Sequence, residues 1–502
     1  MFKRIQLFVF LIMVVGFLYI VTEFWGSWIV TAYSIFISIS VVFISFLIFI
    51  ENRNPSQTLN WLLVLAAFPG VGFFFYLFFG QNFRKRKMFK QKAELDLRAF
   101  RQVEGSRFLN QRELNELGDY QRQSFRLAQR LGHSPISFHT DTRVLTNGSE
   151  SFPAMLEELK QAEHHIHLEF YIVRDDQLGN EFKDVLVEKA NNGVEVRFLY
   201  DAVGSWELSN GFKEELKRAG VEMVPFSPVK LPFLNNKINF RNHRKIVVVD
   251  GKIGFAGGLN IGDEYIGRNK YYGNWRDTHL YVRGEAVRSL QTIFLQDWYY
   301  MTGKALLKPA YLSPEYIIEN KGGVQLVAGG PDTEWETIKM LFFSLMTSAQ
   351  QSIWIASPYF IPDTDILSAI KTAALSGVDV KLLVPNRPDK KIVFYASQSY
   401  YPELLEAGVK IYRYNEGFLH SKVMIVDQEL ASIGTSNMDM RSFHLNFEVN
   451  AFLYKTDSVE QLVTDFEKDL QHSTQLEHSR FLKRPIFMKI YESTCRLLSP
   501  LL

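Results

Sequence analysis

The sequence predicts an α/β protein with two tandem domains, each a mixed sheet flanked by helices, that share one active-site cleft and follow an N-terminal transmembrane region. Three observations predict this architecture: apolar runs near the N-terminus, helical and β-rich segments that alternate after about residue 140, and one short motif that occurs twice. With 502 residues, the chain can form more than one hydrophobic core. A single cysteine, Cys495, excludes an intramolecular disulfide framework.

The apolar runs comprise residues 5–22, 28–50 and 58–80 and contain almost no charge. The second and third are long enough to cross a bilayer as helices. Lys3 and Arg4 precede the first run, as in a secretory signal, but further apolar runs follow it without a small-residue cleavage pattern. We therefore expect a membrane region over residues 1–82 with two to three hydrophobic segments.

Basic residues bear on the topology of this region. Lys3 and Arg4 favour a cytoplasmic N-terminus, and a second basic cluster favours a cytoplasmic start of the following part. That cluster comprises Arg84, Lys85, Arg86, Lys87, Lys90 and Lys92. Three full spans would place the two ends on opposite sides, so either one run is re-entrant or interfacial, or the positive-inside rule is broken. Pro69-Gly70 within the third run favours a re-entrant segment, and hence a multi-pass protein of the cell membrane with cytoplasmic catalytic domains. The basic cluster could also contact anionic headgroups or act as a simple stop-transfer signal.

The remaining chain contains an internal repeat. A predicted helix over 151–162 leads into a strand at 165–172, and a helix over 333–349 leads into a strand at 352–360. Gly193 and Gly377 each end a further helix before another β-rich run. We therefore expect a basic, helical linker at 83–138, a first domain at 139–322, a second at 323–480 and a basic amphipathic tail at 481–502. The tail could lie on a membrane surface or pack as a C-terminal helix.

The repeated motif is His-x-Lys-x4-Asp. Its copies are His243, Lys245 and Asp250, and His420, Lys422 and Asp427; the spacing from each histidine to a later asparagine, Asn260 or Asn437, is the same. Because side chains alternate along a strand, each histidine and lysine share one face. Each aspartate falls on the opposite parity at a turn, so within this candidate catalytic set it ranks below the other two and could anchor the turn instead.

Cleavage of a phosphodiester requires an attacking group, a proton donor for the leaving alkoxide and positive charge for the phosphoryl oxygens. Two histidines can supply the first two, and Lys245 and Lys422 the charge, with Asn260 and Asn437 as hydrogen-bond donors. Since each motif carries half the set, the two domains must face each other. This chemistry calls for no metal or cofactor, and His164, His165 and His167 lack a matching ligand cluster.

Two acidic residues downstream of the motifs complete the predicted site. Asp277 lies in Trp-Arg-Asp-Thr-His and Glu448 in Asn-Phe-Glu-Val-Asn. We expect them to hold one imidazole nitrogen of each catalytic histidine, which would fix the tautomer and raise the basicity of the other nitrogen.

These paired motifs resemble those of the phospholipase D superfamily, over nearly the whole chain after residue 140. Four segments are similar to bacterial cardiolipin synthases in particular: Asn-x-Arg-Asn-His-Arg-Lys at 239–245, Gly-Gly-x-Asn-x-Gly-x-Glu-Tyr at 257–265, Trp-Arg-Asp-Thr-His at 275–279 and the run 437–448. The membrane segment at 54–63 also resembles that family. The resemblance implies two phospholipase D-like domains.

The resemblance further implies that two phosphatidylglycerol molecules condense to cardiolipin and glycerol through a phosphohistidine intermediate. By analogy His243 is the nucleophile and His420 the acid, although the reverse assignment stays open. The expected partners are membrane phospholipids. A phospholipase D-type lipid hydrolase or another phosphatidyltransferase would use the same residues. The apolar runs and the lack of an extended basic stripe disfavour a nuclease, so no nucleic-acid partner is expected.

Overall fold

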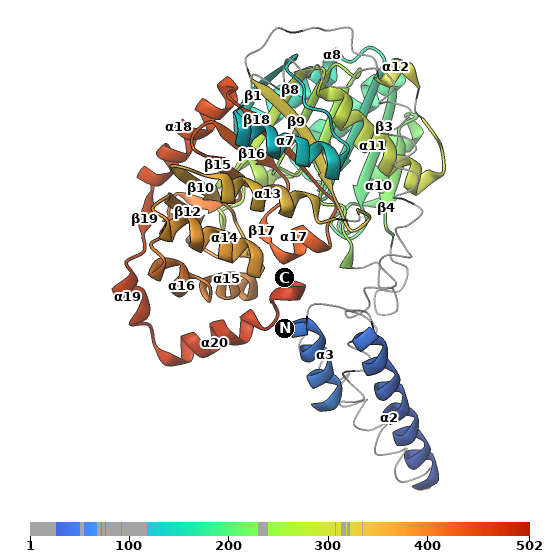
Figure 1. Cartoon of the computed structure of the whole chain (residues 1–502). Helices are drawn as coiled ribbons and strands as arrows, with labels where there is room; N and C mark the ends of the chain where they lie inside the picture. The colour runs from blue at the N-terminus through green and yellow to red at the C-terminus, as the bar shows by residue number, and fades with distance from the viewer. Residues whose placement is uncertain are drawn as a thin grey trace. The chain divides into compact units, whose positions relative to one another are not determined.

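The structure is a computed structural model that describes residues 27–50, 55–67, 72, 76, 92, 118–228, 239–306, 308–312, 318, 322–333 and 335–502. The chain divides into two compact units, Met1–Lys87 and Met88–Leu502, which are described separately below (Figure 1).

The N-terminal unit contains the helices α2 (Ser27–Ile50) and α3 (Pro55–Ala67), neither of which carries a charged residue. They pack through Ile44, Ile48, Leu65 and Tyr76. Many other large apolar side chains of both helices are exposed: Ile35, Phe36, Ile39, Val42, Phe43, Phe46, Phe49, Ile50, Leu59, Leu63 and Val64.

Within the described part of the chain, no helix combines the length and apolar character needed for a membrane span. The predicted transmembrane region is therefore not confirmed. The first apolar run, most of the basic cluster and Pro69-Gly70 lie outside the described residues.

The first half of the larger unit forms a seven-stranded sheet with the order β1-β8-β6-β5-β2-β3-β4. Strands β2, β3 and β4 are parallel and the other pairings are antiparallel. The strands are β1 (Thr140–Thr146), β2 (His165–Phe170), β3 (Glu195–Asp201), β4 (Glu222–Phe226), β5 (Ile246–Val249), β6 (Ile253–Gly257) and β8 (Thr278–Gly284). The associated helices are α8 (Asn147–Gln161), α9 (Gln177–Asn191), α10 (Asn210–Arg218), α11 (Val287–Thr302) and α12 (Pro309–Leu312), with the 3-10 helix η3 (Asp263–Ile266).

The second half forms an eight-stranded sheet with the order β19-β13-β12-β10-β15-β16-β18-β9. Its strands are β9 (Gly323–Gly329), β10 (Ser352–Ala356), β12 (Asp379–Pro385), β13 (Lys410–Tyr414), β15 (Val423–Val426), β16 (Leu430–Gly434), β18 (Glu448–Tyr454) and β19 (Ser473–Gln475). The helices of this half are α13 (Thr337–Ser348), α14 (Thr364–Leu375), α15 (Lys391–Gln398), α16 (Tyr401–Glu406), α17 (Met440–His444), α18 (Asp457–Gln471), α19 (His478–Leu482) and α20 (Ile486–Arg496), followed by η4 (Ser499–Leu501). A further helix, α7 (Asp119–Gly132), adds Phe125 and Ala128 to the core of this half.

The two sheets have the same topology. Read from β9, the second order becomes β9-β18-β16-β15-β10-β12-β13, which matches β1-β8-β6-β5-β2-β3-β4 strand for strand, with β19 added at the edge. The helix-ending glycines that the sequence predicts are also present. Gly193 and Gly377 both have positive φ, 90° and 95°, and each lies two residues after the last residue of its helix, α9 or α14. The predicted α/β class with duplicated mixed sheets is confirmed.

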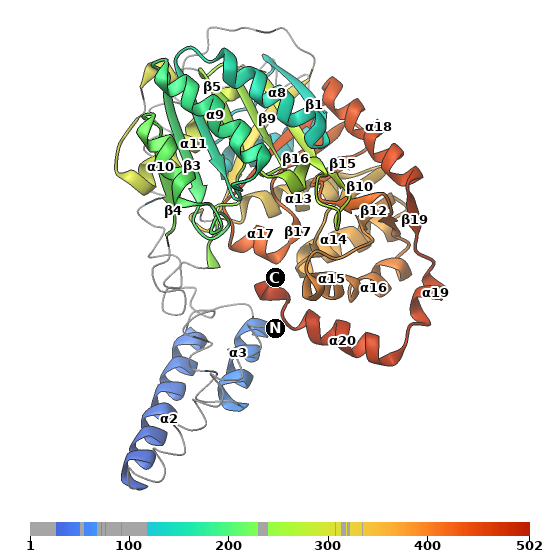
Figure 2. The ribbon, with the colours of Figure 1, turned by 180° about the vertical axis from the view of Figure 1, so that it is seen from behind.

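The two halves of the larger unit lie side by side (Figure 2). They share one hydrophobic cluster and exchange backbone hydrogen bonds. Ile246 and Val248 of β5 pack in the same cluster as Trp354 of β10 and Ile425 of β15. The short strand β7 (Asn274–Arg276) of the first half pairs in parallel with β14 (Gly417–Leu419) of the second. An isolated bridge joins Asn242 of the first half to Phe447 of the second. Within the second half, β11 (Phe360–Ile361) pairs with β17 (Met438–Asp439). The pairing of β7 with β14 and the Asn242–Phe447 bridge are connections between the halves. These two connections bring the two motifs together.

Candidate active site

Each motif histidine is held through its backbone by the opposite half of the unit. The His243 N–H donates to the Phe447 carbonyl oxygen at 2.9 Å, and the His420 N–H donates to the Arg276 carbonyl oxygen at 2.7 Å. Phe447 and Arg276 directly precede Glu448 and Asp277. These two backbone hydrogen bonds therefore place each carboxylate beside the histidine of the other half.

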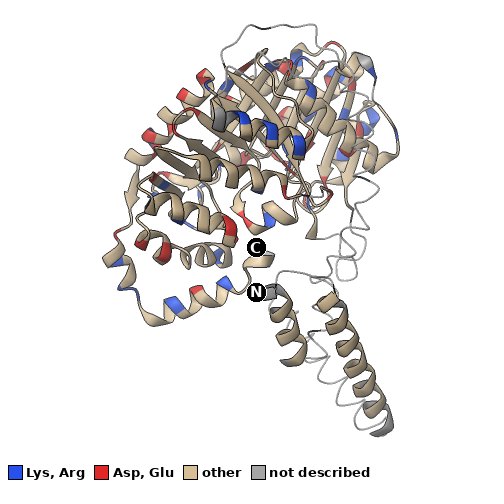
Figure 3. Ribbon diagram, in the orientation of Figure 1, with Lys and Arg blue, Asp and Glu red and all other residues tan. Residues whose placement is uncertain are grey.

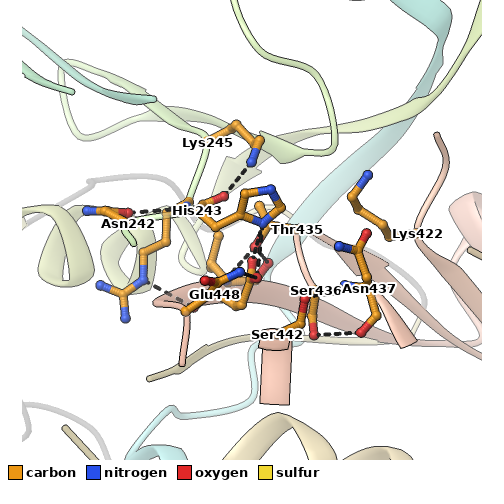
Figure 4. Close-up of polar contacts among 12 residues, drawn as sticks. Asn242, His243, Lys245, Lys422, Thr435, Ser436, Asn437, Ser442 and Glu448 are labelled. Carbon is orange, nitrogen blue, oxygen red and sulfur yellow. Dashed lines mark hydrogen bonds and ion pairs between the residues drawn. The ribbon is translucent and has the colours of Figure 1, made fainter. Parts of the chain in front are cut away.

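The first pair consists of His243 and Glu448 (Figure 4). The imidazole Nδ1 lies 3.0 Å from Oε1 and 2.9 Å from Oε2 of Glu448. Asn446 donates from Nδ2 to Oε1 at 3.2 Å. Burial, together with the positive charges of Lys245 and Lys422, holds the pKa of His243 well below its usual value. Burial also raises the pKa of Glu448 to about 7.

The second pair consists of His420 and Asp277, with Nδ1 2.6 Å from Oδ2. Oδ1 of Asp277 accepts from the Thr278 N–H at 2.8 Å. Burial and then Lys422 lower the pKa of His420 to about 4, although the Asp277 charge opposes this shift. Burial disfavours the charged form of Asp277, but Lys422 and His420 outweigh it and lower the pKa of this carboxyl. The two pairs therefore differ, because Asp277 is readily ionised and Glu448 is not.

The two imidazoles are slightly exposed, whereas their carboxylates are fully buried. The side chains of His243 and His420 are 12% and 9% exposed, whereas those of Glu448 and Asp277 are 0% exposed. The small exposed part of each pair therefore belongs to the imidazole, and the carboxylate is fully buried.

The two motif lysines lie beside the histidines, as strand alternation predicts. Lys245 Nζ donates to the His243 carbonyl oxygen, and Lys422 Nζ donates to the His420 carbonyl oxygen. Lys422 Nζ also lies 3.0 Å from Nδ1 of His420. Figure 4 shows the His243 ring with both ammonium groups close by. Burial lowers the pKa of Lys245 to about 7 and also lowers the pKa of Lys422. Positive charge from both halves thus acts on one small region.

The two motif asparagines are buried. Asn260 Oδ1 accepts from the Ile172 N–H at 3.0 Å. The Asn437 N–H donates to Ser442 Oγ at 3.2 Å, and Asn437 Oδ1 has no hydrogen-bond partner among the described residues. No hydrogen bond from either side-chain amide to a motif histidine is present in the described part of the chain.

The structure does not bring Asp250 and Asp427 to the histidines. Asp250 lies at the far end of β5, seven residues from His243, which corresponds to roughly 20 Å of extended chain. Its carboxylate accepts from the backbone N–H groups of Glu163, His164 and His165 at 2.8–2.9 Å.

Asp427 makes the equivalent contacts in the second half, with the N–H groups of Gln350, Gln351 and Ser352. Its φ of 52° is close to the 53° of Asp250, so both aspartates have the left-handed conformation that this residue type tolerates. In both halves the motif aspartate caps the start of the central strand, β2 or β10, and contacts no reacting group.

Two of the other histidines singled out in the sequence, His165 and His167, have structural partners. His165 Nε2 and His167 Nδ1 both bond the side chain of Gln291, at 3.1 and 2.7 Å. Their rings are buried in β2. Among the described residues, no group of three or more His, Cys, Asp or Glu side chains is arranged to hold a metal ion.

Sequence reasoning missed a buried charged cluster beside His243. Arg244, which has the opposite strand parity, donates to the Glu448 carbonyl oxygen at 3.1 Å and to Asp297. Asp297 also pairs with Lys92, at 3.0 Å, and Lys92 lies 2.8 Å from Asp332. The side chain of Lys92 is 1% exposed, so a headgroup contact is the wrong prediction for this member of the basic cluster. The one indication of this cluster in the sequence is that Arg244 points to the opposite face of the strand from His243 and Lys245.

Sequence reasoning also missed two tyrosines, Tyr171 directly after β2 and Tyr359 three residues after β10. The Tyr171 ring lies edge-on to His243, with 5.0 Å between centroids, and the Tyr359 ring lies edge-on to His420 at 6.5 Å. Lys245 lies over the Tyr171 ring at 5.4 Å. Each imidazole therefore has an aromatic wall from its own half.

Comparison with known proteins agrees with this geometry. Residues 155–298 and 342–470 match the family model described as cardiolipin synthase, PLD-like domain. Residues 34–81 match a model described as phospholipase D-nuclease N-terminal. The cardiolipin synthases of Alkalihalophilus pseudofirmus and Halalkalibacterium halodurans are 63% and 62% identical to this chain, each over 100% of both chains.

A phosphatidylserine synthase from Haemophilus influenzae has a similar fold. Its crystal structure aligns with a TM-score of 0.57 and 16% identity, over 76% of this chain and 100% of that one. This likeness concerns the fold alone. The matched models, and relatives that are similar over their full length, show that the chain belongs to the cardiolipin synthase family of phospholipase D-like proteins.

Proposed function

We propose that this protein is a cardiolipin synthase that transfers a phosphatidyl group from one phosphatidylglycerol to another. The observation that carries the proposal is the pair of slightly exposed imidazoles, each bonded to a buried carboxylate of the other half. Phosphoryl transfer with two histidines needs one neutral ring to attack phosphorus and one protonated ring to release the alcohol. The family membership supplies the substrate class.

His243 suits the role of nucleophile. Burial and two ammonium groups keep its ring neutral. When Glu448 is ionised it accepts from Nδ1–H, so the lone pair of Nε2 is left for attack. In the first step, the bond from Nε2 to phosphorus forms and the bond from phosphorus to the headgroup glycerol oxygen breaks.

His420 suits the role of general acid and base. The ionised Asp277 lies 2.6 Å from its Nδ1 and opposes the fall of the His420 pKa to about 4 that burial and Lys422 cause. The negative charge of a bound phosphodiester would favour the protonated ring further. His420 gives its proton to the departing glycerol. It then takes a proton from the terminal hydroxyl of a second phosphatidylglycerol, whose oxygen attacks phosphorus and displaces His243. The products are one glycerol and one cardiolipin, and both histidines return to their starting states.

Lys245 and Lys422 would stabilise the phosphoryl oxygens. Both ammonium groups are buried, so their field on an anionic substrate is only weakly screened by water. Asn437 could donate to a phosphoryl oxygen from its side-chain amide, since its carbonyl oxygen has no partner among the described residues.

We also infer that the N-terminal unit lies in the cell membrane as a multi-pass region and that the catalytic unit faces the cytoplasm. The exposed apolar side chains of α2 and α3 support a lipid environment, because water disfavours a continuous apolar surface of this kind. The basic residues near both ends of this unit favour the cytoplasmic orientation. Labelling of the exposed Glu467→Cys thiol by an impermeant reagent should occur only after the cells are opened.

The experiment supplies purified full-length protein with phosphatidylglycerol alone and follows lipids and glycerol by mass spectrometry. Cardiolipin and glycerol in equal amounts support the proposal, whereas phosphatidic acid without cardiolipin would indicate a hydrolase and refute it. His243→Ala and His420→Ala should each abolish turnover. His478→Ala, at an exposed histidine of α19, is the matched control and should retain full activity.

A further inference from the structure

Helix α20 has its apolar side chains on the outside. Six large apolar residues of the helix and the segment after it are exposed by 41% or more: Ile486, Phe487, Ile490, Tyr491, Leu497 and Leu498. Their spacing of one, three, four and six to seven residues places them along one side of a helix. We call these six residues the outer stripe. A helix of a soluble domain normally buries such a stripe, whereas α20 exposes it.

The opposite side of α20 is fixed to the catalytic unit. Glu492 and Cys495 are buried, and Arg484 pairs with Glu492. At the C-terminal end, Arg496 lies over the Tyr400 ring at 4.1 Å and pairs with Glu403 at 3.0 Å. These contacts determine the rotation of the helix, so most of the outer stripe faces away from its own domain. Tyr491, at one edge of the stripe, lies edge-on to the Tyr395 ring at 4.9 Å.

The charges around the outer stripe are basic. Between His478 and Leu498 the chain has five Lys and Arg residues and one acid, Glu492, which is buried. Arg480 and Lys483 are exposed before α20, and Lys489 lies at one edge of the stripe. Figure 3 shows basic residues along α19 and α20. The exposed surface thus combines an apolar stripe with positive charge, which is the composition of helices that lie in the interface of an anionic bilayer.

We propose that α20 docks the catalytic unit on an anionic lipid surface, with the outer stripe inserted among the acyl chains and the basic side chains at the headgroups. The choice of lipid rests on the proposed function, in which substrate and product are both anionic phospholipids. A second copy of the chain fits less well, because two such surfaces would place like charges opposite each other.

The test places an environment-sensitive fluorophore on Phe487→Cys in the full-length protein, reconstituted in nanodiscs that contain phosphatidylglycerol and a lipid-borne quencher near the headgroups. Cys495 is buried, so the unsubstituted chain should take up almost no label. Glu467→Cys, at an exposed position of α18, carries the same fluorophore as a matched control. We expect several-fold stronger quenching at position 487 than at position 467.

A second variant separates lipid docking from packing against protein. Ile486→Ser, Ile490→Ser and Leu497→Ser, combined on the Phe487→Cys background, should abolish the quenching and leave the melting temperature unchanged. Equal quenching at 487 and 467 would overturn the proposal. A fluorophore at 487 that is shielded from water but not quenched by lipid would also overturn it, since protein would then cover the stripe. A large fall in the melting temperature of the triple-serine variant would overturn it as well.

The quenching needs no turnover, so its result is independent of the proposed function. Quenching without formation of cardiolipin would refute the proposed function but not the proposed docking of α20. A chain that forms cardiolipin without quenching at position 487 refutes the docking alone.

Discussion

Nδ1 of His243 lies 2.9 Å from Oε2 of Glu448, a carboxylate that belongs to the other half of the catalytic unit. The reciprocal contact joins His420 to Asp277 at 2.6 Å. Neither half therefore contains a complete histidine–carboxylate pair, and the two halves depend on each other for the orientation of both imidazoles.

Glu448→Gln should lower kcat by about 10²–10⁴-fold, because an amide neither fixes the Nδ1–H tautomer nor stabilises positive charge on the ring. Single-turnover rates measure the effect, and an unchanged melting temperature shows that the fold is retained. Glu467→Gln, on the exposed side of α18, is the control. A Glu448→Gln rate within tenfold of the unsubstituted protein would contradict a positioning role for this carboxylate.

The pH dependence of kcat/KM should be bell-shaped with its maximum near pH 7. Glu448, with its pKa raised to about 7 by burial, is protonated below that pH, and the productive carboxylate is lost as pH falls. Lys245, with its pKa lowered to about 7 by burial, loses its charge as pH rises. Because the two groups interact, the limbs report the pair rather than either residue alone.

Lys245→Arg should move the alkaline limb of this profile upward by more than one pH unit, because arginine stays charged, while the acid limb persists. The measurement is kcat/KM of both proteins between about pH 5 and pH 10. Coincident alkaline limbs would rule out Lys245 as the titrating group.

Asp250→Ala should reduce stability more than catalysis. The carboxylate accepts three backbone N–H groups at the start of β2, and their loss should lower the free energy of unfolding by about 1–3 kcal/mol. Asp250→Asn keeps an acceptor and tolerates the positive φ, so its cost should be smaller. Denaturant unfolding and kcat per folded molecule are the readouts. Complete loss of kcat in a folded Asp250→Asn protein would instead place Asp250 in the chemistry.

Lys92→Met should destabilise the catalytic unit by about 3–5 kcal/mol, since it leaves Asp297 and Asp332 buried without this cation. Lys183→Met, which removes an ion pair to the half-exposed Glu215, should cost at most about 1 kcal/mol and is the control. Equal melting temperatures for the two variants would show that Lys92 is not needed to balance the buried acids.

The sequence predicted the local features of the site well. The duplicated helix and strand pattern follows from side-chain periodicity, and alternation along a strand placed His243 and Lys245 together. The same alternation separated Asp250 from them, because the parity of a strand is a local property.

Features that depend on packing between distant segments could not be predicted in the same way. Glu448 and Asp277 were recognised as partners of the histidines, but the crossing between halves arises from the pairing of β7 with β14 and of Asn242 with Phe447. Lys92 resembled a headgroup-binding residue because it follows an apolar run, whereas its burial depends on acids far along the chain. The periodicity of α20 predicted an apolar stripe but not that the stripe would face outward.

The most direct test of the two-histidine mechanism is the identity of the covalent intermediate. Full-length protein is mixed with phosphatidylglycerol, quenched during the first turnover, digested and analysed by mass spectrometry. The mechanism predicts a phosphatidyl group on the peptide that contains His243, formed before cardiolipin appears and absent from the His243→Ala protein. A phosphatidyl group on His420, or cardiolipin that forms without any modified histidine, would contradict it.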